Sequence, residues 1–325
     1  MTMLDPGRER TERPTADSLD AYRSALLGYC YRMLGSAADA VQETMVRAWR
    51  GLDRYEGRAP LEAWLYRIAT NVCLNHLRGR RRRALPMDVS EAATATASLG
   101  AGHADRWIEP IADGLVTEPS ADPGEVAADR ETIRLAFVAA LQLLPPRQRA
   151  VLILRDVLRW KAEEVAALLD VSVVSVKSSL QRARARMAAD PPRPPAPADR
   201  ALLDRYLDAF GRFDIDALVR LLREDATLSM PPYDLWLQGR DEIRAFLLGR
   251  GAECAGSLLT PIEANGTLGF TQHRRTGPGG ALEPFAVTVV EAANGLVTSI
   301  HAFLDPATVE RFAPRFSRCA DRSRV

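Results

Sequence analysis

The sequence predicts a multidomain protein: two all-α modules, then an α+β cone whose helices pack on a curved antiparallel sheet. Apolar residues recur at helical spacing in the first two modules, and segments that alternate apolar and polar residues occur in the last third. With 325 residues, 47% of them hydrophobic, the chain is long enough for two or three packed domains. The predicted boundaries are 17–83 and 130–189 for the helical modules, 84–129 for an acidic linker, 190–198 for a proline-rich connector and 199–325 for the cone.

Charge is divided unevenly among these segments, although the formal net charge is only +1. Lys and Arg exceed Asp and Glu by 5 in 17–83 and again by 5 in 130–190, whereas the acids are in excess by 8 in 84–129. Basic modules of this kind commonly bind nucleic acid. The remaining segment, 191–325, has a net charge of −1 and is expected to have a different task.

Several classes of protein are disfavoured by the composition. The N-terminus has no hydrophobic signal-peptide core and no apolar run is long enough to span a bilayer, so we expect a cytoplasmic protein that does not bind membranes. The four cysteines lie far apart, without a Cys-x-x-Cys pair or clustered histidines, so neither a metal site nor a disulfide framework is expected. No phosphate-binding loop or nucleophile elbow is present, and no cofactor is expected.

Two amphipathic helices are predicted in the first module, over 39–54 and 61–78. A helix buries the residues that share one face, spaced three and four apart. In the first helix the predicted buried stripe is Val41, Met45, Ala48, Trp49 and Leu52. In the second it is Leu65, Ile68, Ala69, Val72 and His76, with Arg67, Thr70, Asn71 and Arg78 facing outward.

The second module has helix-turn-helix spacing: a helix over 162–169, a turn at 170–172 and a second helix over 173–187. Ser172 stands at the N-cap of the second helix, whose expected buried stripe is Val176, Leu180, Ala183 and Met187. Short polar side chains and arginines on the other side suit base edges and phosphates in a major groove. They are Val174, Ser175, Ser178, Gln181 and Arg182, flanked by Arg184 and Arg186. The alternative is a helical hairpin that merely faces solvent.

Two long motifs carry a family resemblance. "DAVQETMVRAWRGLDRYEGRAPLEAWLYRIATNVCLNHLRGRRRR" and "LPPRQRAVLILRDVLRWKAEEVAALLDVSVVSVKSSLQRARARM" resemble regions 2 and 4 of bacterial sigma factors of the extracytoplasmic-function (ECF) group. The resemblance implies a sigma factor that binds core RNA polymerase and directs promoter-specific transcription initiation, with no catalytic activity of its own. It also implies that the acidic linker runs through the polymerase toward the RNA exit path.

The resemblance assigns roles to three surfaces. Docking on the β′ clamp helices is implied for Asp39, Gln42, Glu43, Arg47 and Arg50, which on the residues alone form only a solvated helix face. Recognition and melting of the −10 element are implied for the loop Glu56, Gly57, Arg58 and Ala59 and the helix residues Trp64, Tyr66, Arg67 and Asn71, where Trp64 is equally well a core aromatic. Phosphate contacts are assigned to Arg78, Arg80, Arg81, Arg82 and Arg83. Recognition of the −35 element is implied for Ser172, Val174, Ser175, Lys177, Ser178, Gln181, Arg182 and Arg184, in a module that also meets the β flap.

The third module begins with two amphipathic helices, and a further helix is expected in "LQGRDEIRAFLLGR". Alternating segments follow, with Asn294-Gly295 as a hairpin signal. This pattern resembles the SnoaL-like (ketosteroid-isomerase-like) superfamily, whose cone encloses a pocket. The resemblance places Tyr206 as the oxyanion-hole tyrosine, but Met230 stands at the base position and Val287 at the acid position, so proton abstraction lacks its base. Other candidate pocket residues are Tyr233, Trp236, His301 and Asp305, although a histidine on a strand, such as His301, is more often structural.

Appended domains of this kind are known as built-in regulators in some sigma groups. The island "RWIEPIADGL" resembles the Trp/Pro segment of their linkers, and "FLDPATVERF" stands where they carry a terminal motif. We therefore expect Trp107, Ile108, Glu109, Pro110 and the C-terminal tail to tie the third module to the first two and modulate initiation in cis. The alternatives are a passive stabilising domain, a one-component regulator that senses a small-molecule ligand, and an isomerase fused to DNA-binding modules.

Overall fold

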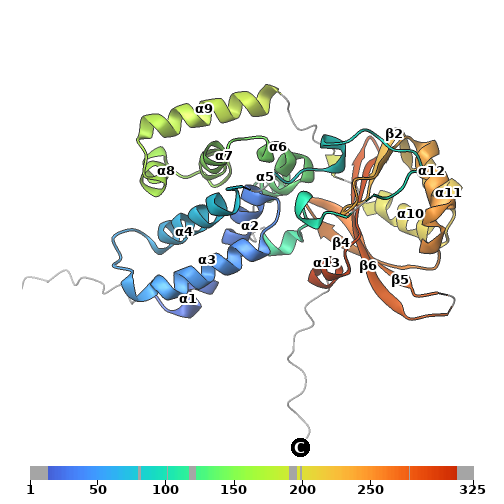
Figure 1. The fold of residues 1–325 in the computed structure, drawn as a ribbon, viewed down its shortest axis with the longest axis horizontal. Coiled ribbons are helices and arrows are strands. Elements are labelled where there is room, and N and C mark those ends of the chain that lie inside the picture. Colours follow the sequence, from blue (N-terminus) through green and yellow to red (C-terminus); the bar gives the residue numbers. More distant parts are fainter. Residues whose placement is uncertain are drawn as a thin grey trace, which may run out of the picture.

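A computed structural model describes residues 14–79, 82–100, 102–116, 122–189, 196–197, 200–277 and 279–312. Its helical half and its α+β half lie side by side, as Figure 1 shows, and the predicted fold class is confirmed. The first module contains α1 (Ala16–Asp20), α2 (Arg23–Leu34), α3 (Ala38–Gly51), the short η1 (Leu52–Arg54) and α4 (Leu61–His76). The second contains α5 (Pro123–Ile133), α6 (Leu135–Gln142), α7 (Pro146–Leu152), the π-helical turn η5 (Ile153–Val157), α8 (Ala162–Leu169) and α9 (Val173–Ala189).

The first module follows the predicted helices but not every predicted face. On α3 the fully buried side is Ala40, Val41, Thr44 and Ala48, whereas Trp49 is 64% exposed. The predicted stripe was one residue too wide, because Trp49 lies about 100° around the helix from Ala48. On α4, Thr70 was expected to face outward and is buried instead, and Tyr66, to which the resemblance gave a role in −10 recognition, is buried as well.

The second module matches the predicted helix-turn-helix. The helix, turn and second helix fall at 162–169, 170–172 and 173–189, and the Ser175 N–H donates to Ser172 Oγ at 3.2 Å, which confirms the N-cap. Val176, Leu180 and Ala183 are buried, and Met187 is half-buried. Helix α5 begins at Pro123, where the Asp122 side chain accepts a hydrogen bond from the Gly124 N–H and caps the first turn. The helix therefore starts before the predicted boundary between the linker and the second module, at 129/130, and runs across it.

The third module is a mixed sheet with helices on its outer side (Figure 1). Strand order is β3-β2-β7-β6-β5-β4, and all of these neighbours pair antiparallel except β2 and β7. Asn294 and Gly295, both at positive φ, form the predicted hairpin turn between β6 and β7. The elements are β1 (Ala196–Pro197), α10 (Arg200–Gly211), α11 (Ile215–Arg220), β2 (Leu222–Ser229), β3 (Trp236–Gln238), α12 (Arg240–Leu248), η6 (Arg250–Cys254), β4 (Leu258–Ala264), β5 (Thr267–Arg275), β6 (Leu282–Ala293), β7 (Leu296–Phe303) and α13 (Pro306–Phe312).

The proline-rich connector falls largely outside the described residues. Its described part, Ala196–Pro197, is extended and pairs with Glu291 and Ala292 of β6. None of the helices in the described ranges is long and apolar enough to cross a membrane.

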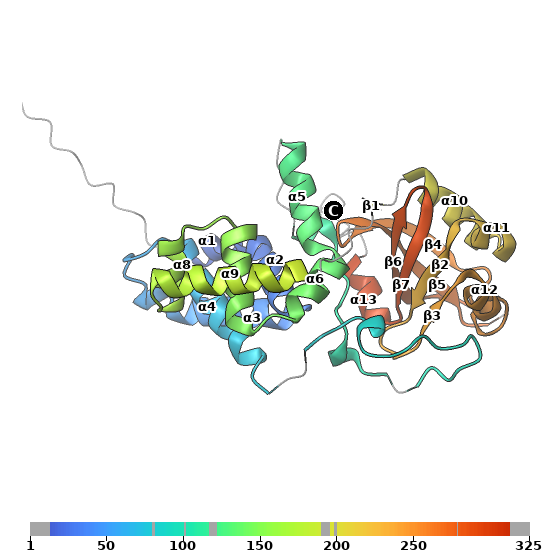
Figure 2. The ribbon, with the colours of Figure 1, turned by 90° about the horizontal axis from the view of Figure 1, so that it is seen from above.

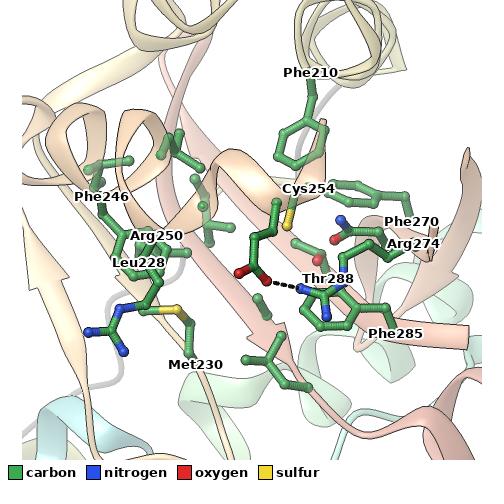
Figure 3. Close-up of a pocket in the computed structure, with 18 of the residues that line it drawn as sticks. Phe210, Leu228, Met230, Phe246, Arg250, Cys254, Phe270, Arg274, Phe285 and Thr288 are labelled. Carbon is green, nitrogen blue, oxygen red and sulfur yellow. Dashed lines mark hydrogen bonds and ion pairs between the residues drawn. The ribbon is translucent and has the colours of Figure 1, made fainter. Parts of the chain in front are cut away.

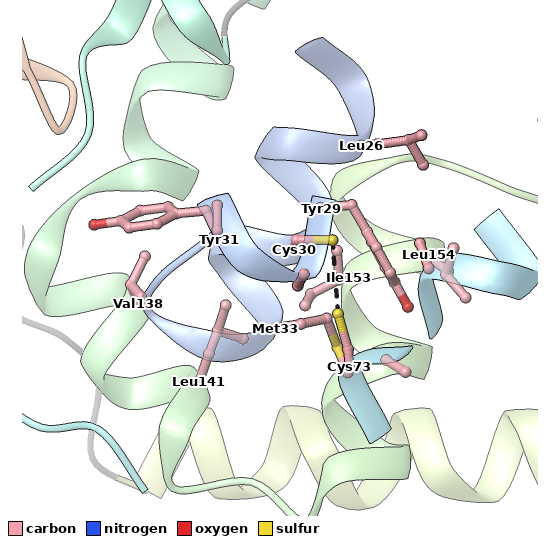
Figure 4. Packing of buried hydrophobic residues seen from close by; sticks show 14 of the residues in the cluster. Leu26, Tyr29, Cys30, Tyr31, Met33, Cys73, Val138, Leu141, Ile153 and Leu154 are labelled. Carbon is pink, nitrogen blue, oxygen red and sulfur yellow. Dashed lines mark hydrogen bonds between the residues drawn. The ribbon is translucent and has the colours of Figure 1, made fainter. Parts of the chain in front are cut away.

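Buried apolar side chains form two clusters. One joins the first and second modules into a single continuous core that also takes in Ala264, Val289 and Phe303 of the sheet. Figure 4 shows part of it, where Tyr31 of α2 faces Val138 and Leu141 of α6. The second cluster fills the space between the other face of the sheet and helices α10 to α12. The two helical modules therefore pack as one body against one face of the sheet.

The predicted linker is an ordered strap over most of its length. Figure 2 shows it leaving the first module after α4, running past β3 and α12, and returning toward α13. Its ends meet where the Ala84 N–H donates to the Arg106 carbonyl and the Ile108 N–H donates to the Ala84 carbonyl. We call residues 84–107, apart from the undescribed residue 101, the strap. It lies on this chain's own domains, and its short helical turns are η2 (Pro86–Asp88) and η3 (Ala104–Arg106), with η4 (Asp113–Leu115) beyond it.

Candidate functional site

The outward face of α3 is the surface predicted to dock on polymerase. Asp39, Gln42, Arg47 and Arg50 are exposed, and Glu43 is half-buried. Glu43 is held by Arg47 at 2.5 Å and by His76 Nε2 at 2.7 Å, and these contacts, the hydrogen bond to His76 first, lower the pKa of its carboxyl. Sequence reasoning missed Val46 and Trp49, which are exposed on the same helix. An exposed tryptophan among paired charges is typical of a protein interface.

The loop and helix predicted to open the −10 element are partly accessible. Glu56, Gly57, Arg58 and Ala59 are all exposed, with Glu56 and Arg58 ion-paired, and Gly57 has the positive φ that glycine tolerates. On α4, Arg67 and Asn71 are exposed. Trp64 is half-buried against Tyr55, with 5.2 Å between ring centroids.

Tyr66 is not available to DNA in this arrangement. Its ring is buried between Tyr29 at 5.2 Å and Trp160 of the second module at 5.0 Å. Trp160 lies directly before α8, so the second module covers this part of α4. A helical wheel drawn on α4 alone cannot register a neighbour 94 positions away, so the sequence of this helix gave no sign that Trp160 covers Tyr66.

The arginine run after α4 is divided between two environments. Arg78 and Arg82 are exposed, and Arg80 and Arg81 lie outside the described residues. Arg83, predicted to hold phosphate, is instead occupied within the chain: Nη1 donates to the Trp107 carbonyl at 2.5 Å and Nη2 lies 3.3 Å from Glu109. Arg83 therefore closes the strap rather than facing solvent.

Helix α9 presents the surface predicted for the −35 element. Val174 is 76% exposed, and Lys177, Gln181 and Arg182 are exposed, while Ser175 and Ser178 are half-buried. Arg184 is exposed but held by both oxygens of Asp156 of η5, at 2.6 and 2.9 Å, and this contact raises the pKa of its guanidinium. The N-terminal half of α9 thus offers short or apolar side chains, which suits contact with base edges.

Buried polar contacts join the two helical modules beneath these surfaces. Arg149 of α7 is buried and donates to the carbonyls of Met33 and Leu144 and to both oxygens of Gln142; burial lowers its pKa to about 10. Arg32 of α2 donates to Thr132 Oγ1 at 2.6 Å. Opening this interface would strand buried donors and acceptors, each at a cost of about 1–3 kcal/mol.

The tip of the β4–β5 hairpin, Asn265 and Gly266, enters the junction between the modules. Asn265 is buried, and its Nδ2 donates to Tyr31 Oη at 2.6 Å and to the Ile133 carbonyl at 2.9 Å. Its Oδ1 accepts from the Ile111 N–H at 3.1 Å. One side chain of the third module therefore touches α2, the segment after the strap and the end of α5.

Gly266 fits closely against the second module. A Cβ atom there would lie 2.2 Å from the Arg130 carbonyl oxygen, and φ is +68°. Its N–H donates to Asp113 Oδ1 at 2.9 Å, and the other carboxylate oxygen of Asp113 lies 3.7 Å from Arg130 Nε. Burial raises the pKa of Asp113 to about 6, against the N–H of Gly266 and the positive charge of Arg130, which lower it.

The Trp107 segment crosses between the modules, as its sequence suggested. Trp107 is buried and its Nε1 donates to the Pro232 carbonyl at 2.7 Å. Ile108 is buried in the core shared by the helical modules, and the Glu109 carbonyl accepts from Tyr31 Oη at 2.8 Å. The carboxylate of Glu109 also lies 3.1 Å from Arg311 of α13, so the C-terminal helix is tied to the same segment. Pro110 is buried beside them.

A cavity of about 380 Å³ lies between the sheet and its outer helices. Figure 3 shows aromatic side chains around it, among them Phe210, Phe270 and Phe285, and Tyr206 and Tyr233 also line it. Its polar lining includes Gln272, Thr288 and an ion pair of Arg274 with Glu253 at 2.9 Å. Met230 occupies the position where a base was sought, so the cavity has room for a ligand but no unpaired carboxylate.

Four expected pocket residues lie elsewhere. Trp236 turns to the strap, with its Nε1 donating to the Ser90 carbonyl at 3.0 Å, and His301 pairs with Ser229 through Nδ1 at 2.9 Å on the opposite face of the sheet. Asp305 lies in a surface groove beside Trp107. Val287 is also absent from the cavity lining, because successive side chains alternate between faces and Thr288 is the one that points inward.

Comparison with known proteins identifies the modules. Residues 19–83 match Sigma-70 region 2, 134–187 match Sigma-70 region 4, and 203–300 match the SnoaL-like domain. The chain is 41% identical over 322 residues to the ECF RNA polymerase sigma factor SigG of Mycobacterium tuberculosis, covering 94% of this chain and 86% of that one.

The chain belongs to the ECF sigma factors. It is also 28% identical over 305 residues to SigJ of the same organism, covering 88% of this chain and 90% of SigJ. The crystal structure of SigJ shares the fold, with a TM-score of 0.62 at 22% identity over 92% of this chain and 99% of that one. As an ECF sigma factor the protein acts in promoter-directed transcription initiation, for which it binds core RNA polymerase and promoter DNA.

Proposed function

We propose that the described arrangement is the resting form of this sigma factor, in which the C-terminal domain holds regions 2 and 4 together and so restrains initiation. The observation that carries the proposal is the buried hairpin tip: Asn265 hydrogen-bonds to region 2 through Tyr31 and to the segment before region 4 through Ile133. A part of the third module is thereby built into the junction of the other two.

The distance between the two promoter elements shows why holding regions 2 and 4 together would restrain initiation. Elements named for positions −10 and −35 are about 25 base pairs apart, which is roughly 85 Å along B-DNA at about 3.4 Å per base pair. Helix α4 of region 2 packs against α8, the first helix of the helix-turn-helix. Both modules therefore engage a promoter only after they separate.

The same proposal assigns the surfaces. Core polymerase binds the exposed face of α3, including Trp49 in addition to the predicted charges. The 56–59 loop, Arg67 and Asn71 read the −10 element, and Tyr66 joins them only after region 4 moves away. The −35 element is read by the exposed residues of α9, which are Val174, Lys177, Gln181 and Arg182.

The C-terminal domain acts in this proposal by binding and not by catalysis. The carboxylate in its cavity lining, Glu253, is paired with Arg274, and the thiol of Cys254 has its pKa raised by burial. A general base needs a free acceptor near its operating pH. The cavity suits a small-molecule ligand, because it is concave and mostly apolar with a few polar groups.

Two matched glycines test the restraint. Gly266→Ala adds a methyl group that meets Arg130, whereas Gly295→Ala adds one to the β6–β7 hairpin with nothing within 4 Å, at nearly the same φ. Both changes carry the intrinsic cost of placing alanine at a positive φ. A difference in activity between the two variants therefore reports the effect of disturbing the contact between Gly266 and Arg130. In run-off transcription with purified core RNA polymerase and a promoter selected in vitro, we expect Gly266→Ala to initiate more strongly than Gly295→Ala. Equal activity of the two variants would contradict the proposal.

A further inference from the structure

The strap forms part of the wall of the C-terminal cavity. Ala93, Ala95, Ala97 and Leu99 pack on the core of the third module, whereas Thr94, Thr96 and Ser98 between them are exposed. The Ala97 N–H donates to the Thr94 carbonyl at 3.0 Å, so a turn in the middle of this segment keeps the small apolar side chains against the third module. Leu99 is the strap residue that lines the cavity, together with Pro306 at the start of α13 and Leu304 two residues before it.

Backbone hydrogen bonds hold the strap on both sides of Leu99. The Ala93 N–H donates to the Trp236 carbonyl at 2.8 Å, and the Ala95 N–H donates to Glu242 Oε2 at 2.6 Å. Beyond Leu99, the His103 N–H donates to the Pro232 carbonyl at 2.9 Å. Arg250, another residue of the cavity lining, donates to the Ala97 carbonyl at 3.4 Å. Any occupant of the cavity therefore meets the segment that ties region 2 to the C-terminal domain.

We propose that the cavity binds an uncharged, ring-containing small molecule, and that the bound molecule packs on Leu99 and holds the strap in place. The chemical class follows from the lining. Phe210, Phe246, Phe270 and Phe285 supply aromatic walls, while Thr288 and Gln272 supply a hydroxyl and an amide for one polar group. The charged pair of Arg274 and Glu253 is already neutralised within the protein, and the other charged residue of the lining, Arg250, is exposed to solvent and donates to the Ala97 carbonyl, so no ionic group of the ligand is required.

The direction of the effect follows from linkage. An empty apolar cavity leaves its lining without contact partners, and an occupant supplies them to Leu99 only while the strap is in place. A ligand that gains contacts in one arrangement shifts the population toward it. Given the proposed restraint by the C-terminal domain, on which the regulatory consequence rests, occupancy favours the resting form.

N-phenyl-1-naphthylamine, a neutral aromatic dye that fluoresces in apolar surroundings, is the probe. We expect saturable binding to the full-length protein, and slower amide hydrogen exchange by mass spectrometry in peptides covering 90–103 when the dye is bound. Ala302→Trp, which fills the cavity from β7, should weaken dye binding at least tenfold, and Ala281→Trp, at an exposed position outside the lining, should not. If Ala302→Trp fails to fold, Met230→Trp fills the cavity from the other side.

Leu99→Ser separates binding from coupling. This variant should still bind the dye, several-fold more weakly, and the dye should no longer slow exchange in 90–103. Absence of saturable binding to the wild-type chain, binding that survives both filling variants, or slowing that persists in Leu99→Ser would each overturn the proposal. None of these measurements involves polymerase or DNA, so they can fail while the two glycine variants still differ in transcription, and the reverse also holds.

Discussion

The side-chain amide of Asn265 donates a hydrogen bond to the phenolic oxygen of Tyr31, 2.6 Å away, although 234 positions separate the two residues. The same hydroxyl donates to the Glu109 carbonyl. The hydroxyl of Tyr31 is therefore the point at which three parts of the chain meet: the β4–β5 hairpin tip, helix α2 of region 2 and the segment that follows the strap. Burial raises the pKa of Tyr31 well above the physiological range, so the hydroxyl keeps its proton and its role as a donor.

Asn265→Asp should weaken this junction. The aspartate keeps the shape of asparagine and its tolerance of positive φ, but it replaces two donated hydrogen bonds with a buried acceptor facing the Ile133 carbonyl. Loss of buried donors costs about 1–3 kcal/mol each. The population of molecules in which the helical modules have separated from the third module should therefore rise at least tenfold. Small-angle X-ray scattering measures this population as an increase in the radius of gyration. Asn294→Asp, at the same position of the exposed β6–β7 turn, is the control, and an equal increase in both variants would refute the assignment.

Asp113 should make the junction sensitive to pH. Its pKa in the packed arrangement is about 6, above the ordinary value of 3.8, so the protonated form favours packing. The resulting stability is fully present below about pH 4 and is lost as the pH rises through 6. The charged groups around Asp113 are Arg130, Arg134 and Glu263.

Between pH 7 and pH 5 the packed form should therefore gain about 1–1.5 kcal/mol from Asp113, at 1.4 kcal/mol per pKa unit. Asp113→Asn can still accept from the Gly266 N–H and should remove this gain. The check is the difference between the two proteins in hydrogen exchange of peptides covering 108–116 at each pH, corrected for the intrinsic rate. A wild-type protein whose protection relative to Asp113→Asn is the same at both pH values would contradict the prediction.

Local patterns predicted the helices well because their evidence lies within a few residues. The stripe of Val176, Leu180 and Ala183 and the N-cap at Ser172 are both properties of one short segment. The Asn294-Gly295 turn is likewise local. The Asn265-Gly266 pair carries the same signal, but only the packing of distant helices distinguishes the buried tip from the exposed one.

The strap was predicted only as part of an acidic linker, although its sequence holds a usable signal. In "ATATASL" small apolar residues alternate with Thr and Ser, and in the structure the alanines and Leu99 pack on the third module although Thr94 to Ala97 form a turn. The alternation was overlooked because alanine contributes little to a hydrophobic pattern and because the acidic residues of the surrounding segment favoured a solvent-exposed linker. Burial of Tyr66 had no such signal in α4, because the side chain that covers it, Trp160, belongs to the other module.

Trp49 should be a main contact with core polymerase. Its side chain is 64% exposed, so Trp49→Ala removes no core packing and should leave the free energy of unfolding nearly unchanged. Central tryptophans of an interface contribute 2 kcal/mol or more, so affinity for core polymerase should fall about 30-fold. Val174→Ala, a change at another exposed apolar side chain, on α9, should leave polymerase binding intact and weaken promoter binding. Native gel titration with core enzyme separates the two, and an unchanged affinity of Trp49→Ala would exclude this face of α3.

Arg82 and Arg83 should behave differently although they are adjacent in one basic run. Phosphate contacts were assigned to the run as a whole, and the exposed Arg82 fits that role. Arg82→Ala should weaken promoter binding across sequences and reduce the slope of log affinity against log salt by about 1. Arg83→Ala instead removes the partner of the Trp107 carbonyl and one of the two arginine partners of Glu109, which loosens the strap from region 2. Hydrogen exchange of 90–107 should accelerate in Arg83→Ala and not in Arg82→Ala.

If both variants lose one unit of salt slope and neither alters the strap, then Arg83 binds phosphate as well, and its contact with Glu109 is broken when the sigma factor binds DNA.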